Sequence, residues 1–243
     1  MASTSETGHN KNVANFQDLI SFVTGYGVTY NPTKNTLKLA ELNALVTTSQ
    51  TNLADVITKN TAYNSKINDR FIAFKDLKSL STRLINALQS TDATTQKVAD
   101  AKAFNKKMQG IRAKAVTAPA DPSTPAPTTI STSQLSYDSQ IQHLAGIISV
   151  LQSETSYAPN ETDLKIASLT AKQTDLTAKN NAVANAYTSV SNSRILRDKT
   201  LYATSTGLFD IATEVKKYVK SIYGTTSPQF AQVKGIEFTK KRK

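Results

Sequence analysis

The chain repeats itself: several segments of its first half recur in its second half, in the same order and about 123 to 127 residues later. The longest match joins residues 30–42, YNPTKNTLKLAEL, to residues 157–169, YAPNETDLKIASL. Further along, QTNL at residues 50–53 recurs as QTDL at residues 173–176. Separate matches in one order are typical of an internal duplication, which decides how every later segment is interpreted.

Proline-rich sequence separates the two copies. Residues 118–129, APADPSTPAPTT, hold four prolines among serine and threonine and cannot continue a helix. We therefore divide the chain into a disordered N-terminus at 1–11, helical repeat 1 at 12–116, a Pro/Ser/Thr linker at 117–134, helical repeat 2 at 135–238 and a basic tail at 239–243.

Apolar residues follow helical spacing in both repeats. Each repeat opens with a short amphipathic segment, at residues 16–23 and 141–151. Between residues 39 and 77 the apolar residues of repeat 1 alternate at spacings of three and four, as in antiparallel bundles and coiled coils. One helix of about 40 residues and two antiparallel helices that turn near residues 64–68 both satisfy this pattern.

The fold class that follows is all-α: two tandem homologous helical bundles of long antiparallel helices, joined by the Pro/Thr-rich linker. The pairs Asn35-Thr36 and Thr162-Asp163 are the predicted N-caps of the long helices. A last helix is expected in each repeat, around residues 84–88 and 208–222. Residues 233–238 alternate weakly, which is the one strand signal in the chain.

Six polar residues match between the copies at identical internal spacing: Tyr63, Asn68 and Arg70 with Tyr187, Asn192 and Arg194. A tyrosine and an arginine seven residues apart lie on one helical face, where they can form a polar site. The interpretation we favour is structural, with the tyrosine packed in the helix seam, the arginine stem over it and its charge paired to a nearby acid.

The end of the chain resembles a known kind of sequence. Residues 215–230 read VKKYVKSIYGTTSPQF, residues 233–236 read VKGI, and residues 191–198 read SNSRILRD. These segments are similar to the C-terminal helix and tail of a family of uncharacterised, duplicated helical-bundle proteins from bacteria, notably Bacteroidetes. The resemblance implies an α-helical fold and carries no activity.

Positive charge is concentrated at the end of each repeat. Of 29 basic and 18 acidic residues, residues 97–114 hold six basic residues against Asp100, and residues 216–243 hold eight against Glu237. Contact with an anion and a solvated tail that keeps the protein soluble explain this charge equally well. The candidate contact residues are Lys106, Lys107, Arg112, Lys114, Lys216, Lys217, Lys220, Lys240, Lys241, Arg242 and Lys243.

Signals of catalysis are missing from the sequence. The chain has no cysteine and two histidines, of which His9 falls in the predicted disordered start and His143 is expected on a helix surface. No nucleophile–base pair, metal-ligand spacing or phosphate loop occurs, so we expect no enzyme, catalytic residue, metal or cofactor. The start lacks the apolar stretch of a signal peptide and no apolar run approaches a membrane span, so we expect a cytoplasmic protein.

These features favour a non-enzymatic structural or interaction protein, with tandem bundles that mediate protein–protein contacts or self-assembly. The expected partner is a protein, either a second copy in a homo-oligomer or another chain. The alternative is a protein that binds nucleic acid or an anionic surface through the basic end segments.

Overall fold

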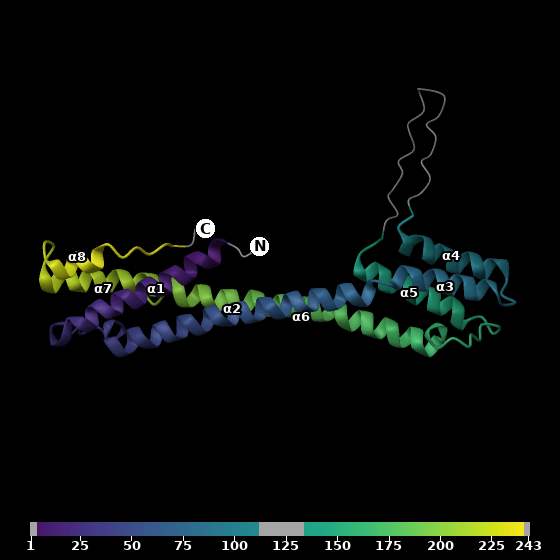
Figure 1. Cartoon of the computed structure of the whole chain (residues 1–243), viewed down its shortest axis with the longest axis horizontal. Coiled ribbons are helices and arrows are strands. Elements are labelled where there is room, and N and C mark those ends of the chain that lie inside the picture. Colours follow the sequence, from purple (N-terminus) through teal and green to yellow (C-terminus); the bar gives the residue numbers. More distant parts are fainter. Residues whose placement is uncertain (1–3, 112–133, 241–243) are drawn as a thin grey trace, which may run out of the picture. The chain divides into compact units, whose positions relative to one another are not determined.

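The computed structural model describes residues 4–111 and 134–240, and within these ranges every regular element is a helix (Figure 1). The all-α prediction is confirmed. The elements are α1 (Thr4–Gly25), η1 (Gly27–Thr29), η2 (Asn35–Leu37), α2 (Leu39–Phe74), α3 (Leu77–Gln89), α4 (Thr95–Gln109), α5 (Tyr137–Gln152), η3 (Thr162–Leu164), α6 (Ile166–Tyr202), α7 (Leu208–Tyr223) and α8 (Pro228–Lys234).

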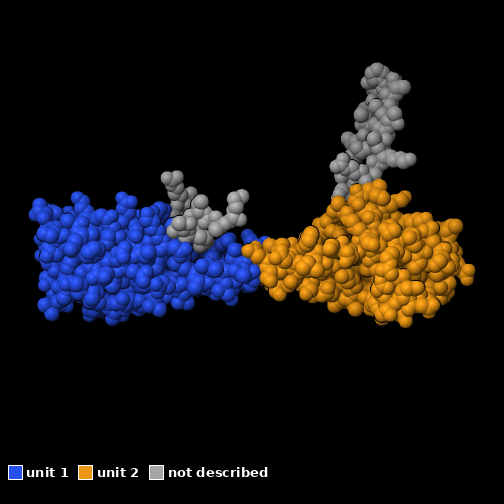
Figure 2. Space-filling view, viewed as in Figure 1, with its two compact units in different colours: residues 1–63, 186–243 blue, residues 64–185 orange. Residues whose placement is uncertain are grey.

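The chain forms two compact units that do not follow the predicted repeats (Figure 2). Unit 1 comprises Met1–Tyr63 and Ala186–Lys243, and unit 2 comprises Asn64–Asn185. Each unit therefore combines one half of repeat 1 with the complementary half of repeat 2. The predicted division at 12–116 and 135–238 does not describe how the chain packs.

Helices α2 and α6 explain this difference, because each contributes to both units. Residues 39–74 contain no glycine or proline, so nothing in that segment ends the helix or turns the chain back. A helix of 36 residues is about 54 Å long at a rise of about 1.5 Å per residue, which is too long for one small core. The alternative of two antiparallel helices turning near residues 64–68 is therefore wrong.

Unit 1 has its own hydrophobic core, to which both ends of the chain contribute. From the first half come α1, whose Phe16, Leu19 and Val23 are fully buried, and the first part of α2. From the second half come the end of α6, then α7 and α8. The amphipathic segment predicted at residues 16–23 thus packs against helices of the other repeat, chiefly α7.

Unit 2 has a second core, separate from the first. It joins α3 and α4 to α5, η3 and the first part of α6. Leu144, Ile147 and Leu151 of α5 are buried in it, together with Leu84 and Leu88 of α3. The helices predicted around residues 84–88, 141–151 and 208–222 are all confirmed.

Within each unit α2 and α6 run antiparallel. In unit 1 the Asn52 Nδ2 donates to Thr200 Oγ1 over 2.8 Å, while the Tyr63 and Tyr187 rings lie 5.7 Å apart, centre to centre. From the first pair to the second, the residue number rises along α2 and falls along α6, so the two helices run in opposite directions. In unit 2 the Arg70 Nη1 donates to Asn180 Oδ1 over 2.8 Å.

Three further predictions require correction. Residues 4–11 are the first turns of α1 and not a disordered start; His9 is buried there, and Asn12, which follows in the same helix, is buried as well. The pairs Asn35-Thr36 and Thr162-Asp163 lie inside the 3-10 turns η2 and η3 instead of capping α2 and α6. The weak strand signal at residues 233–238 corresponds to no strand, since Val233 is buried in α8 and residues 236–240 have no regular secondary structure.

The predicted linker does not join separate units. Residues 112–133 lie outside the described part of the chain, but α4 before them and α5 after them pack together in unit 2. A Cβ atom added to Gly110 would lie 2.8 Å from Leu135 Cδ1, so the flanking residues are in contact. The described chain passes between units inside α2 and α6 instead.

Candidate functional site

The chain after α8 lies along α1 as a docked peptide. We call residues 236–240 the C-terminal segment; it has no regular secondary structure and lies beside α1 in Figure 1. Asn12 of α1 is 2% exposed and makes both hydrogen bonds that the backbone of Thr239 offers. The Asn12 Nδ2 donates to Thr239 O over 2.8 Å, and the Thr239 N–H donates to Asn12 Oδ1 over 2.9 Å. An amide side chain thus binds this segment through its backbone.

Two more side chains donate to carbonyl groups of the same segment. The Asn15 Nδ2 donates to Glu237 O, and the Lys216 Nζ of α7 donates to Ile236 O. Ile236 and Phe238 are half-buried whereas Glu237 is exposed, as expected when alternate residues of an extended peptide face its support. The Phe238 ring meets the buried Phe16 ring edge-on at 6.4 Å.

Lysines of this region contact aromatic rings of the same unit. Lys216 lies 5.2 Å from the Phe238 ring centre, and burial lowers its pKa, partly offset by Glu237. Lys240 lies 5.6 Å from the ring of Phe209 on α7. These cation–π contacts attach the segment to α7. Part of the basic charge predicted to contact an anion therefore has a structural role.

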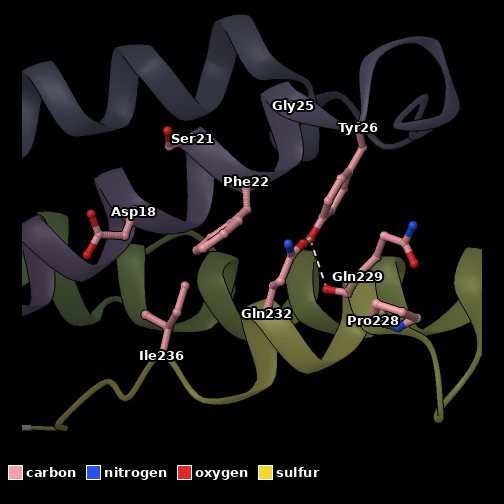
Figure 3. A pocket seen from close by; sticks show the side chains of 9 residues that line it. All are labelled: Asp18, Ser21, Phe22, Gly25, Tyr26, Pro228, Gln229, Gln232 and Ile236. Atoms are coloured by element: carbon pink, nitrogen blue, oxygen red, sulfur yellow. Dashed lines mark hydrogen bonds between the residues drawn. The ribbon is translucent and has the colours of Figure 1, made fainter.

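A groove of about 620 Å³ lies between α1, α8 and the start of the C-terminal segment (Figure 3). Phe22 of α1 and Ile236 point toward one another and give it an apolar wall. On the opposite side the Tyr26 hydroxyl donates to Gln229 O over 2.9 Å and lies 3.1 Å from Gln232 Oε1. The groove is thus an opening beside the docked peptide.

The groove is lined by few ionisable groups. Its one carboxylate belongs to Asp18, and neither a histidine nor another base lines it. Burial and the neighbouring Tyr223 raise the pKa of Tyr26, so its hydroxyl stays protonated and acts as a donor. An apolar wall with hydroxyl and amide groups opposite can accept a peptide side chain and its backbone.

Both histidines are buried, contrary to the sequence prediction. His9 lies in unit 1, with its Nδ1 2.7 Å from the Tyr202 hydroxyl, which also accepts from Asn12. His143 lies in unit 2 and is 5% exposed; its Nε2 has no hydrogen-bond partner. Burial, then the positive charge of Lys107, lowers the pKa of His143.

The predicted basic contact residues are divided between the units. Lys106 and Lys107 lie in the last turn of α4 in unit 2. Unit 1 holds the basic residues of α7 and the C-terminal segment, Lys216, Lys217, Lys220 and Lys240, of which all but Lys216 are exposed. The others lie outside the described residues: Arg112, Lys114, Lys241, Arg242 and Lys243.

The repeat-matched polar residues do not form one site. Tyr63 and Tyr187 lie against each other in unit 1, whereas Arg70 lies in unit 2 with its guanidinium 4.0 Å from the Tyr137 ring centre. Arg194, the sequence counterpart of Arg70, is exposed. Asn68 and Asn192 are exposed as well.

Sequence reasoning missed two pairs of exposed apolar residues. Phe71 and Ile72 on α2 are 63% and 67% exposed, and Ile195 and Leu196 on α6 are 64% and 50% exposed. The pairs lie 124 residues apart and follow Arg70 and Arg194 directly, so the match between these two sequence segments was a usable signal. Adjacent large apolar side chains in solvent are typical of contact surfaces.

Among the described residues, no group of three or more histidine, cysteine, aspartate or glutamate side chains is placed to hold a metal ion. None of the helices described is long and apolar enough to span a membrane. Comparison of the chain with protein-family models, curated proteins and solved structures gave no match.

Proposed function

We propose that this chain is a non-enzymatic interaction protein that associates with other copies of itself through exposed surfaces of its helical units. The observation that carries the proposal is the pair of matched apolar dipeptides, Phe71-Ile72 and Ile195-Leu196, on the solvent side of α2 and α6. Burying such side chains against a partner releases about 25 cal/mol per Å² of apolar surface.

The proposal includes the internal duplication, which recurring local structure supports. The Tyr30 hydroxyl donates to Leu37 O over 2.8 Å, and the Tyr157 hydroxyl donates to Leu164 O over 2.9 Å. In each case the bond closes the 3-10 turn that precedes a long helix. A duplicated chain that carries the same surface twice can contact two neighbours and extend an assembly.

Sedimentation equilibrium of the full chain over a range of concentrations tests the proposal. We expect dimers or larger species that tolerate moderate salt. Replacing both Ile195 and Leu196 with serine should weaken association at least about tenfold, because two apolar side chains are lost from the contact. The control is Thr47→Ser with Thr48→Ser on an exposed face of α2, which should associate as the parent does. A strict monomer at high concentration contradicts the proposal.

A second function, binding to nucleic acid or an anionic surface, is favoured by one observation: Lys217, Lys220, Lys234 and Lys240 are all exposed on unit 1. This proposal predicts retention on heparin or DNA at low salt that falls steeply as salt rises. Lys217→Gln with Lys234→Gln should lower the elution salt. No retention at low salt rules this function out.

A further inference from the structure

We infer that the surface of α1 and α7 under the C-terminal segment is a peptide-binding site, and that residues 236–240 of a second copy of this chain occupy it by exchange. This inference deepens the proposed function, since it names a partner and a contact for self-association. The docked segment of the same chain already shows what the site binds.

The site recognises the backbone of an extended peptide. The Thr239 N–H and C=O are both bound by Asn12, and the carbonyls of Glu237 and Ile236 are bound by Asn15 and Lys216. Side chains that bind peptide groups in this way act on any chain that presents the same conformation.

Side-chain contacts add specificity for this particular sequence. The ring of Phe238 lies edge-on to Phe16, which is fully buried, and under the ammonium group of Lys216. Ile236 borders the open groove of about 620 Å³ opposite Phe22, so the segment does not fill the surface around it. Residues 236–240 of a second copy have the same sequence and can therefore make all of these contacts at the same site.

Exchange costs little free energy because the contacts that the segment makes with a second copy are the same as those it makes within its own chain. Domain swapping replaces one set of contacts by an identical set and costs mainly the freedom of the second chain. Because the segment is attached to its own chain, its effective concentration at its own site is about mM. A second copy can compete for the segment when another contact already holds the two copies together. In the proposed function the exposed apolar pairs of α2 and α6 supply such a contact.

The absence of cysteine from the chain makes single-cysteine variants a clean test. One full-length chain carries Asn15→Cys in the binding site and the other carries Glu237→Cys in the segment. The two are mixed in equal amounts and treated with a short bismaleimide. Random collisions would make the mixed dimer half of all cross-linked dimers. Exchange predicts that the mixed dimer clearly exceeds this share.

Three controls accompany the mixture. A chain with both cysteines should cross-link within the monomer, and failure to do so would overturn the docked geometry on which the inference rests. Pairing Asn15→Cys with Thr48→Cys, exposed on α2, should give only the random share. Adding Phe238→Ala to the segment donor should lower the mixed dimer severalfold, because the aromatic contact with Phe16 is lost.

A mixed dimer at no more than half of the cross-linked product overturns the exchange. If the full chain nevertheless associates in sedimentation, the proposed function stands and only this contact is wrong. Monomers in sedimentation together with a random cross-linking pattern would overturn both.

Discussion

Asn12 is a buried residue near the start of the described chain that binds the backbone near its end. Its side chain makes both backbone bonds to Thr239 and donates to the Tyr202 hydroxyl over 3.1 Å. Asn12→Ala removes these hydrogen bonds, each of which contributes about 0.5–1.5 kcal/mol. We expect a lower urea midpoint and faster proteolysis after residue 235.

Asn43→Ala is the matched control for Asn12→Ala. Asn43 is exposed on α2 and its Nδ2 donates to Leu39 O within the same helix. A change of this kind usually stays within about 0.5 kcal/mol. Equal effects of the two substitutions would contradict the role given to Asn12.

The buried His143 makes the stability of the protein depend on pH. Its pKa is lowered in the folded state, so the folded protein prefers the neutral ring. The contribution is fully present above the unfolded-state pKa of about 6.5 and is lost as the pH falls through the lower folded-state value. We expect the melting temperature to drop between about pH 7.5 and pH 5, and His143→Leu to reduce that drop. An unchanged drop in the variant would contradict this assignment.

At the scale of residues, sequence patterns predicted the apolar positions better than the polar ones. Phe16, Leu19 and Val23 are buried as their spacing indicated. Asn12 lies on the same helical stripe, four residues before Phe16, and a polar residue in an apolar stripe was a usable signal that it bonds something buried. The identity of its partner, 227 residues away, could not be obtained from spacing.

At the scale of elements, α8 positions the C-terminal segment and depends on its cap. The Ser227 Oγ accepts from the Phe230 N–H over 3.1 Å, and Pro228 occupies the first turn. Ser227→Ala should cost about 1 kcal/mol, seen as a lower urea midpoint and faster amide exchange in α8. Ser221→Ala is the control, since that exposed hydroxyl only bonds back to Tyr218 O in α7. Similar losses from both would contradict the capping role.

The long helices were predictable in kind but not in extent. The three-four spacing and the lack of glycine and proline favoured helix throughout residues 39–74, and α2 occupies all of it. Polar residues in the seam, such as Ser49 and Asn60, made two shorter helices joined by a turn a second possible interpretation of the sequence. Ser49 is fully buried and its hydroxyl bonds Leu45 O, which removes the cost of a polar residue there.

At the scale of the whole molecule, the predicted repeats are defined by sequence matches, whereas each hydrophobic core combines residues from both halves of the chain. Repeat matches indicate which segments resemble each other, but they do not say whether a helix packs against its own copy or the other one. Phe16 of the first half packs in one core with Val215 and Val219 of the second half. The partner choice depends on where α2 ends, a boundary that no residue in its interior marks.

The most direct test that each core is built from both halves of one chain is to cut the chain between the predicted repeats. A specific protease site is placed within residues 117–134 of the full-length protein, and the cleaved product is analysed by size exclusion and circular dichroism. Because both fragments contribute to both cores, we predict that they stay together, with helix content and melting temperature little changed. Two separately eluting, folded fragments would show that each repeat packs by itself and would contradict the account.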